Sequence, residues 1–392
     1  MRLLIHDFAG HPFAAQLSRA LAARGHDVVH GYCGGVTTGR GALRLAEGDP
    51  GSLRFVDVSE VPFERYSPLR RMQSELGYGR RLAHLVREVR PHAVLSANCP
   101  LLAQAMVWRA ASSVGARRCY WLQDFLGRGT RAVLSQKARF LGLTIGVAWE
   151  RLEVSVLRRA DDIVLIADDF EAELRAKRVT TPAVTIPNWT PLDEVPTRPK
   201  RNPWSEAAGL ADRPVALYSG TLGHKHDPEH LVRAATALAA SSGLVVVLTE
   251  GLGRDYLERR RAELGLTNLL LFDFVEWQDL PDVLGTADVL LVLLEQDAGA
   301  FSVPSKVLTY LAAGRAIVGA MPVRNLASRT ITEAGAGVVI APGDHAAFAQ
   351  CVAGLMQDPG DAGRCGRAGR AYAEATFDIG RITDQFEALL TP

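Results

Sequence analysis

The sequence predicts an α/β protein with two doubly wound, Rossmann-like domains, each built on a parallel sheet. Short apolar segments alternate with segments of helical period along both halves of the 392-residue chain, which is the pattern of repeated βαβ units. Between the halves, residues 190–204 are rich in proline and charge and lack periodicity, as is typical of a linker. A chain of this length can hold two domains of ordinary size.

The strand-like segments form two series. In the first series, the helical segment 13–25 follows the first strand and ends at Gly25, a typical helix C-cap. The other members are likewise separated by segments of helical period. The first series comprises residues 2–8, 26–32, 53–59, 92–98, 118–125, 162–168 and 183–188, and the second comprises residues 215–220, 243–251, 268–276, 288–294, 316–320 and 337–342.

These series predict the domain boundaries. We expect a first domain at 1–190, a linker at 191–213 and a second domain at 214–374. The amphipathic residues 377–390 lie beyond the last βα unit, and we interpret 375–392 as a helix that packs back across both domains, onto the first. A terminal helix on the second domain is the alternative. Because such sheets bind ligands outside the carboxyl ends of their strands, we expect the strand-to-helix loops to carry the chemistry, in a cleft shared by the domains.

Composition excludes several classes of protein. The net charge of +1 gives no field that would favour nucleic acid, and the 48% of apolar residues argues against disorder. Five cysteines without a C-x-x-C pair fit reduced thiols and indicate no metal site. No apolar run approaches the roughly 20 residues that span a bilayer, and MRLLIHDF does not resemble a signal peptide. We therefore expect a soluble cytoplasmic protein, at most peripheral to the inner face of a membrane.

The region 297–321 is the most informative stretch. It follows an unbroken apolar run, 288–296, which predicts a central strand buried on both faces. Pro304 is expected to open a helix that ends near Gly314. Lys306 then stands in the first helical turn, where the macrodipole disfavours a cation. An anion docked at that helix N-terminus would explain the lysine, although a solvated lysine is the simpler alternative.

A second loop, 219–227, strengthens the interpretation of an anion site. Its glycines allow close backbone approach and an anion-binding nest, and Lys225 adds positive charge beside them. Because Lys225 and Lys306 fall in equivalent strand-to-helix loops of one sheet, we favour a diphosphate bound between them over two unrelated tight turns. The expected contacts of this loop are Gly220, Thr221, Leu222 and Gly223.

Other loops are weaker candidates. In the first domain, Gly10 allows close approach, and His11 is either a cleft residue or an ordinary surface histidine. Asp124 follows an apolar strand and could orient or deprotonate an acceptor hydroxyl, with helix N-capping as the alternative. In the second domain, the strand ends at Glu250 and Val275 are expected to hold a nucleobase through backbone groups.

Two segments of the first domain, 66–90 and 128–152, mix arginine with apolar residues. Such a mixture favours anionic membrane surfaces or a lipid-linked acceptor. Amphipathic helices with solvated arginines are the alternative.

With these residues identified, the sequence resembles the family-4 retaining glycosyltransferases of the GT-B fold, in the branch that builds bacterial surface polysaccharides such as colanic acid and O-antigen. The resemblance runs along nearly the whole chain. It is densest in 218–232, 274–294 and 303–322, and it includes IPNW at 186–189.

The resemblance implies transfer of a sugar from a nucleotide diphosphate sugar, held by the second domain, to a glycan, lipid-linked or small-molecule acceptor held by the first. Lys225 and the segment Pro304, Ser305 and Lys306 would meet the diphosphate and stabilise the leaving group. No tightly bound cofactor or metal is implied, and Mg²⁺ is compatible with the sequence but not required by it.

The chain departs from the family at two positions. Glutamates that typical members use for the donor sugar and the ribose fall on Phe301 and Thr309 here. Thr309 could reach a ribose hydroxyl, and backbone N–H groups up to Ser302 could replace the sugar contacts. The departure keeps two alternatives open, a nucleotide-sugar epimerase on the same fold and a non-catalytic nucleotide-sugar-binding partner.

Overall fold

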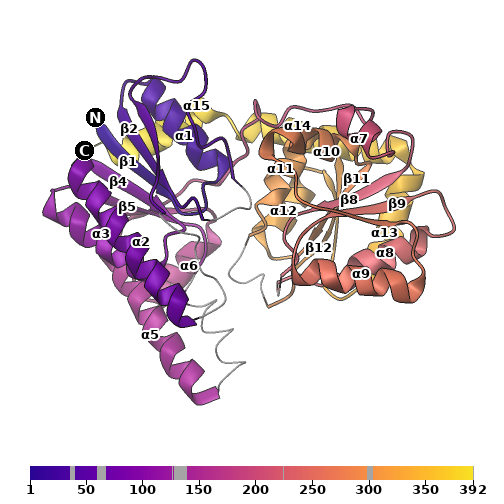
Figure 1. Ribbon diagram of the computed structural model, residues 1–392, viewed down its shortest axis with the longest axis horizontal. Helices are drawn as coiled ribbons and strands as arrows, with labels where there is room; N and C mark the ends of the chain where they lie inside the picture. Colours follow the sequence, from indigo (N-terminus) through magenta and orange to yellow (C-terminus); the bar gives the residue numbers. More distant parts are fainter. Residues whose placement is uncertain are drawn as a thin grey trace. The chain divides into compact units, whose positions relative to one another are not determined.

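The computed structural model of the protein describes residues 1–35, 40–59, 68–125, 127, 139–223, 225–297 and 303–391. The chain forms two compact units. The first unit contains Met1–Asn188 and Asp378–Pro392, and the second contains Trp189–Phe377. Each unit is built on one parallel sheet with helices on both faces (Figure 1). The predicted α/β class with two doubly wound parallel sheets is confirmed.

The first unit has a seven-stranded sheet in the order β3-β2-β1-β4-β5-β6-β7. The order reverses between β1 and β4, which makes their carboxyl ends the switch point where such sheets bind ligands. Helices α1 and α15 cover one face, and α2, α3 and α5 cover the other. The strands are β1 Arg2–Asp7, β2 Asp27–Tyr32, β3 Leu53–Asp57, β4 Ala93–Ala97, β5 Arg117–Leu122, β6 Asp162–Leu165 and β7 Ala183–Thr185; the helices are α1 Pro12–Ala23, α2 Pro68–Val89, α3 Leu101–Ser113, α5 Arg139–Arg158, α6 Asp169–Ala176 and α15 Ile379–Leu390.

The second unit has a six-stranded sheet in the order β10-β9-β8-β11-β12-β13, with its switch point between β8 and β11. All five residues of β11 are buried, so the predicted central strand is confirmed. The strands are β8 Val215–Ser219, β9 Leu244–Leu248, β10 Leu269–Phe272, β11 Val289–Leu293, β12 Ala316–Ala320 and β13 Gly337–Ile340; the helices are α7 Pro203–Ala207, α8 Glu229–Leu238, α9 Leu252–Leu264, η1 Trp277–Asp279 (3₁₀), α10 Leu280–Thr286, α11 Lys306–Ala313, α12 Leu326–Glu333, α13 His345–Gln357 and α14 Pro359–Thr376.

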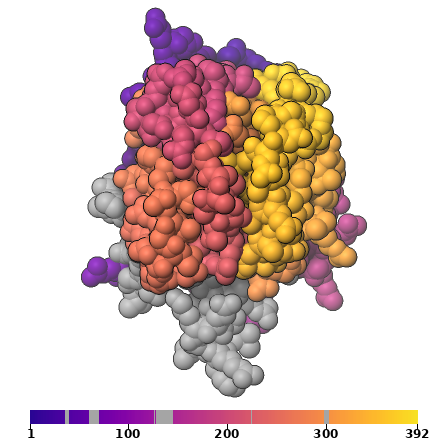
Figure 2. Space-filling view, turned by 90° about the vertical axis from the view of Figure 1, so that its right-hand side faces the viewer, coloured from indigo at the N-terminus to yellow at the C-terminus, as the bar shows by residue number. Residues whose placement is uncertain are grey.

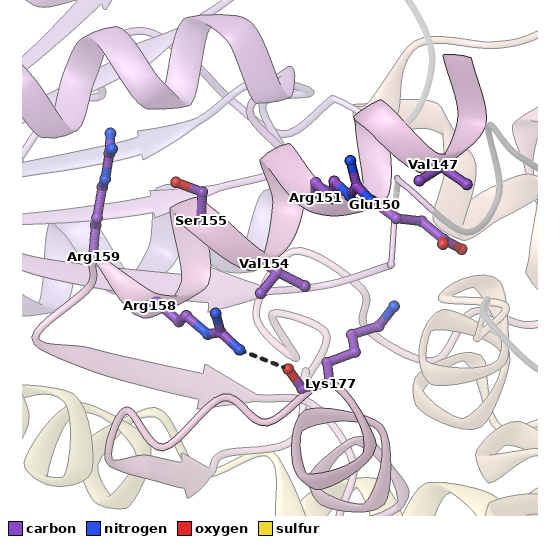
Figure 3. Close-up of a pocket in the computed structure, with 8 residues that line it drawn as sticks. All are labelled: Val147, Glu150, Arg151, Val154, Ser155, Arg158, Arg159 and Lys177. Atoms are coloured by element: carbon purple, nitrogen blue, oxygen red, sulfur yellow. Dashed lines mark hydrogen bonds between the residues drawn. The ribbon is translucent and has the colours of Figure 1, made fainter. Parts of the chain in front are cut away.

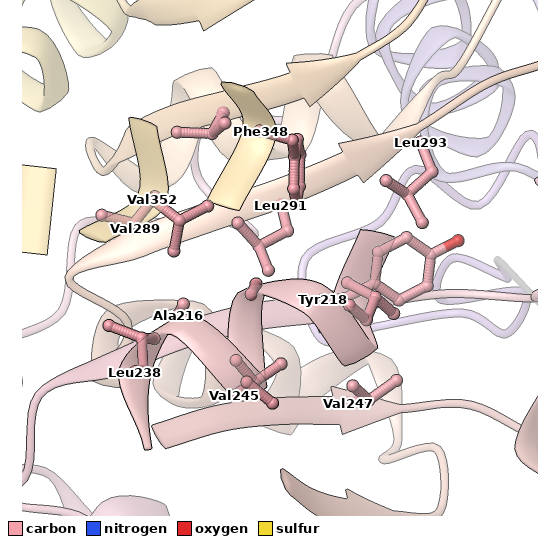
Figure 4. Packing of buried hydrophobic residues seen from close by; sticks show 14 of the residues in the cluster. Ala216, Tyr218, Leu238, Val245, Val247, Val289, Leu291, Leu293, Phe348 and Val352 are labelled. Atoms are coloured by element: carbon pink, nitrogen blue, oxygen red, sulfur yellow. The ribbon is translucent and has the colours of Figure 1, made fainter. Parts of the chain in front are cut away.

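The core of the second unit lies between the sheet and helices α8 and α13. Apolar side chains of the central strands, such as Leu291 and Val245, meet Leu238 of α8 and Phe348 of α13 (Figure 4). From outside, α13 and α14 form a yellow band beside the earlier segments of the unit (Figure 2). This packing fixes the strand ends from which the loops of the switch point emerge.

The segment predicted as a linker contributes an ordered helix to the second unit. Helix α7 begins with a capping box, in which the Asn202 side chain accepts from the Ser205 N–H and the Ser205 hydroxyl accepts from the Asn202 N–H, both at 2.9 Å. Asn202 followed by Pro203 is a helix-start signal that the proline content of the segment obscured.

The C-terminal helix α15 belongs to the first unit, where it packs on α1. Phe386 is fully buried, with its ring centroid 4.8 Å from that of Trp121 on β5. At the helix surface, Glu387 accepts hydrogen bonds from Arg24 at 2.6 Å and from His26 at 2.7 Å. Helix α15 therefore helps to cover a sheet whose first strand starts at Arg2.

Candidate active site

The switch point of the second unit brings together the two loops that the sequence singles out. One follows β8 and begins at Gly220, whose N–H donates to the carbonyl of Leu248 at 3.0 Å. The other precedes α11, whose N-cap is Ser305 and whose first residue is Lys306. Pro304 lies just before the cap, so the helix starts two residues later than predicted. The predicted end is confirmed, because Gly314 is a left-handed C-cap with φ +69°.

Lys306 is the most unusual side chain in this site. Its Nζ is buried and has no hydrogen-bond partner among the described residues, although part of its stem remains exposed. The ammonium group lies 3.7 Å from the centroid of the Tyr218 ring, a cation–π contact. Burial lowers the pKa of Lys306 to about 7. Burying a cation without a neighbouring anion costs free energy, so this position is suited to a negatively charged ligand.

The surrounding backbone is shaped to admit the lysine. Gly220 has φ +140°, and a Cβ at this position would lie 2.5 Å from the Nζ of Lys306. One turn further along α11, the Tyr310 hydroxyl accepts from the N–H of Ser219 at 3.0 Å and contacts its carbonyl at 3.3 Å. Hydrogen bonds from Tyr310 therefore connect α11 to the end of β8, and the ammonium group of Lys306 lies against Gly220.

The pKa of His226 is affected by the positive charges around the loop. Its Nδ1 accepts from the N–H of Gly223 at 3.1 Å. Burial, together with the positive charges of Lys306 and Lys225, lowers the pKa of His226 to about 4. Both predicted lysines thus act electrostatically on one imidazole, as expected if they belong to one anion site. The carbonyl of Lys225 accepts from the N–H of Glu295 at 2.9 Å, which holds the loop to the end of β11.

The remaining predicted positions of the second unit differ in accessibility. Thr221 is exposed, whereas Leu222 is buried and can offer a ligand only its backbone. The Thr309 hydroxyl lies 3.2 Å from that of Thr190. Glu250 is exposed after β9, and Val275 is half-buried after β10. Ser302 and Phe301 lie outside the described residues.

Three ligand-type side chains cluster beside the same loop. Asp227, His230 and His345 each offer one atom within 4.8 Å of the others, a group that could hold a metal ion. Asp227 contacts His345 Nε2 at 2.6 Å and His230 Nε2 accepts from the Gly343 N–H at 3.2 Å. His230 Nδ1 is buried and has no hydrogen-bond partner among the described residues. The cluster ties the loop after β8 to the start of α13. Asp227 and His230 are three residues apart, but His345 is too distant in the sequence for a motif to reveal the group.

The first unit gathers its predicted residues at its own switch point. Gly10, with φ +72°, precedes His11 in the loop after β1. His11 Nδ1 lies 2.9 Å from a carboxylate oxygen of Asp7, which the sequence did not single out. The negative charge of Asp124 also acts on His11, so the structure brings together these two predicted residues.

A separate groove of about 660 Å³ lies along α5 of the first unit (Figure 3). Four cations line it together with Val147, Val154, Glu150 and Ser155; they are Arg151, Arg158, Arg159 and Lys177. Arg158 donates to the carbonyl of Lys177 at 3.2 Å, which fixes one side of the groove. The groove lies partly within the predicted basic segment 128–152. Within the described part of the chain, no helix has the length and apolar character required to cross a bilayer.

Two families match consecutive parts of the sequence. The family described as "Glycosyl transferase 4-like domain" matches residues 9–189, and the family "Glycosyl transferases group 1" matches residues 200–372. Among curated proteins, a protein named as a colanic acid biosynthesis glycosyl transferase, WcaI of Escherichia coli K12, is 29% identical over 179 residues, 45% of this chain and 42% of WcaI. The Pseudomonas aeruginosa protein WbjE, named as a glycosyltransferase, is 27% identical over 205 residues, 52% of this chain and 51% of WbjE. The matches therefore span about half the length of these relatives.

Solved structures share the whole fold at low identity. Sucrose-phosphate synthase from Thermosynechococcus elongatus has a TM-score of 0.75 at 17% identity, covering 99% of this chain and 98% of that one. The Anabaena protein HepE in complex with UDP-glucose has a TM-score of 0.72 at 17% identity, covering 100% and 99%. At this identity the likeness concerns the fold.

Proposed function

We propose that this chain transfers a sugar from a nucleotide diphosphate sugar to a hydroxyl acceptor with retention of anomeric configuration. The premise is that the chain belongs to the group 1 glycosyltransferases with a 4-like N-terminal domain and the GT-B fold. The buried ammonium group of Lys306, without a partner among the described residues, carries the proposal. It stands at a helix N-terminus, where backbone N–H groups and the dipole also favour an anion.

In this proposal Lys306 and Lys225 hold the diphosphate of the donor. As the bond between the anomeric carbon and the diphosphate breaks, negative charge accumulates on the leaving oxygens. A preorganised ammonium group in a water-poor site stabilises that charge more than it stabilises the intact donor. The glycine loop at Gly220 supports the same role, because it lets the backbone approach the ligand closely.

Isothermal titration with UDP, GDP, dTDP and ADP, with and without Mg²⁺, tests the donor site. We expect micromolar binding of one nucleotide, about tenfold or more weaker in Lys306→Ala, where a charged hydrogen bond of about 1.5–3 kcal/mol is lost. Lys225→Ala should weaken it in the same direction. Lys177→Ala, a lysine of the first unit, is the matched control and should bind unchanged. Failure of all four nucleotides to bind would exclude the donor site.

Sugar transfer should depend on the same residue. Lys306→Ala should lower the transfer rate about 10²-fold or more, on the scale of losing one preorganised donor to the developing charge. Binding without transfer or donor hydrolysis would instead identify a non-catalytic binding partner, and sugar interconversion without an acceptor would identify an epimerase.

The acceptor is proposed to be a glycan, a lipid-linked glycan or a small molecule bound by the first unit. The basic groove on α5 supports contact with an anionic membrane surface, because Arg151, Arg158 and Arg159 line it together with apolar Val147 and Val154 (Figure 3). The relative named for colanic acid biosynthesis supports a polysaccharide as the product.

A further inference from the structure

Two histidines and an aspartate form a cluster where the N-termini of α8 and α13 meet. Asp227 lies two residues before α8, His230 is the second residue of that helix, and His345 is the first residue of α13. The two helices pack against each other beside the second sheet (Figure 1). One ligand-type atom of each residue lies within 4.8 Å of the others. All three residues belong to the second unit, so the cluster is described within one compact body.

The aspartate and one of the histidines already face each other. Asp227 Oδ2 lies 2.6 Å from His345 Nε2. The other carboxylate oxygen, Oδ1, accepts from the backbone N–H of Glu229 at 3.0 Å, which fixes the orientation of the carboxylate. Carboxylates that bind metals are commonly held by such an additional hydrogen bond. The side chains of His345 and Asp227 are 32% and 29% exposed, so an ion has access to them from solvent.

His230 is the buried member of the cluster, and its hydrogen bonding is incomplete. Its ring centroid lies 4.3 Å from that of His345 and 5.0 Å from that of Phe348. Nε2 accepts from the Gly343 N–H at 3.2 Å, so the proton of the neutral ring is on Nδ1. Nδ1 is buried and has no partner within the described ranges of the chain. Because a buried N–H without an acceptor costs free energy, the described protein groups alone do not satisfy this imidazole.

We propose that Asp227, His230 and His345 bind a divalent transition-metal ion of the Zn²⁺ type, and that the ion joins the loop after β8 to α13. Two imidazoles and a carboxylate suit Zn²⁺ and similar metals, whereas Mg²⁺ and Ca²⁺ prefer oxygen ligands. The site is independent of the proposed transferase function. The cysteine spacing, which indicates no metal site, does not bear on it, because none of the three ligands is a cysteine.

The geometry of the cluster is close to that of a tetrahedral site. Ligands about 2.1 Å from a tetrahedral Zn²⁺ lie about 3.4 Å from one another, so small side-chain rotations suffice for atoms now within 4.8 Å. The ion takes the position of the hydrogen between Asp227 and His345 Nε2. A neutral His345 then keeps its proton on Nδ1, and a charged His345 also releases one proton to solvent.

Coordination of His230 has the same consequence for its backbone neighbour through either ring nitrogen. Coordination by Nε2 replaces the hydrogen bond from the Gly343 N–H. Coordination by Nδ1 moves the ring proton to Nε2, which can then no longer accept that bond. In both arrangements the Gly343 amide loses its present acceptor, which provides a local signal of metal binding.

The charges around the cluster act in both directions. The N-termini of α8 and α13 disfavour a cation, and so does Lys225 in the same loop. Opposing them are the carboxylates of Asp344, the N-cap residue of α13, and of Glu229 in the first turn of α8. Glu295 is also close, because burial and the negative charge of Asp227 raise its pKa. These carboxylates offset the unfavourable charge of the two helix ends.

The first test measures the metal content and metal affinity of the protein. Tag-free protein is dialysed against EDTA and then equilibrated with Zn²⁺, Co²⁺ or Mg²⁺, and the bound metal is quantified by elemental analysis. We expect one Zn²⁺ or Co²⁺ ion per chain and no Mg²⁺ at the same concentration. His345→Gln and Asp227→Asn should each weaken Zn²⁺ binding about 100-fold or more, since losing a residue that only orients a ligand already costs roughly 10- to 100-fold.

Asp344→Asn is the matched control for this test. The Asp344 side chain accepts from the Ala347 N–H at 3.0 Å as the N-cap of α13, and asparagine caps a helix as well as aspartate does. The variant therefore removes one negative charge beside His345 without removing a ligand, and it should retain Zn²⁺ binding. Three results would each overturn the proposal: no Zn²⁺ bound by the wild type, unchanged binding in His345→Gln, or equal losses in Asp344→Asn and Asp227→Asn.

The second test locates the ion by NMR of protein labelled at its histidine and glycine nitrogens. On addition of Zn²⁺, one ring nitrogen of His230 and one of His345 should shift, together with the backbone amide of Gly343. The ring of His84, an exposed histidine of α2, should not change. A response confined to other histidines would show that the ion binds elsewhere, and the proposed site would then be wrong.

Discussion

At the scale of single residues, the fit between Gly220 and Lys306 leads to a prediction about donor binding. In Gly220→Ala, the new Cβ would lie 2.5 Å from the Nζ of Lys306 and would displace it. We expect nucleotide affinity to fall about tenfold, or about 1.4 kcal/mol, when measured by calorimetric titration. Gly209→Ala is the matched control, because Gly209 also has a positive φ (+70°) but its Cβ would meet nothing within 4 Å. Equal losses in the two variants would attribute the effect to backbone strain.

The lowered pKa of Lys306 predicts how donor binding depends on pH. The free protein loses this charge as the pH rises through about 7, whereas a bound diphosphate favours the charged form and raises the pKa. Affinity for a nucleotide diphosphate sugar should therefore be greatest below pH 7 and fall by up to about tenfold per unit above it, with proton uptake on binding. Calorimetry in buffers of different ionisation enthalpy measures that uptake. It should vanish in Lys306→Met, and its persistence there would assign it to another group.

Some residues of the candidate site could be predicted from the sequence, and others could not. Lys306 was predictable because a cation in a first helical turn contradicts the macrodipole. Asp7 was not, because it ends an ordinary apolar strand, and only the folded loop brings His11 Nδ1 to 2.9 Å from it. The sequence did not single out Tyr218 or Tyr310. Both are buried, and they contact the ammonium group of Lys306 and the end of β8, respectively.

At the scale of elements, periodicity predicted the strands well because both sheets are parallel and their inner strands are buried. Runs such as β9 and β11 are apolar throughout, and the structure places them in the interior of the second sheet. The predicted ends of the strands were less accurate, because the predicted segments included loop residues beyond the last position that pairs with a neighbouring strand. Helix α7 was missed because its five residues are too few to show a period, although Asn202 carries a capping signal.

At the scale of the whole molecule, the first unit is built from two separate pieces of chain. Its main part ends at Asn188, and the chain returns to it only at Asp378, after the entire second unit. The returning helix α15 buries Ile382, Phe386 and Leu390. Because the covered face includes Trp121 of β5, the stability of the first unit depends on residues that follow the entire second unit in the sequence.

This discontinuity predicts different responses of the two units to shortening the chain. Removal of residues 378–392 should expose Trp121 and remove the hydrogen bonds that Arg24 and His26 form with Glu387. Phe386→Ala alone should cost the first unit about 3–5 kcal/mol, the usual loss for a buried phenylalanine, and Gln385→Ala, exposed on the same helix, should cost little. Hydrogen exchange should then show lower protection in β1, β4 and β5 of the shortened protein, while β8 and β11 and the nucleotide affinity of the second unit are retained. Equal loss of protection in both sheets would show instead that the units fold as one cooperative body, and the shortened protein would be expected to lose nucleotide binding as well.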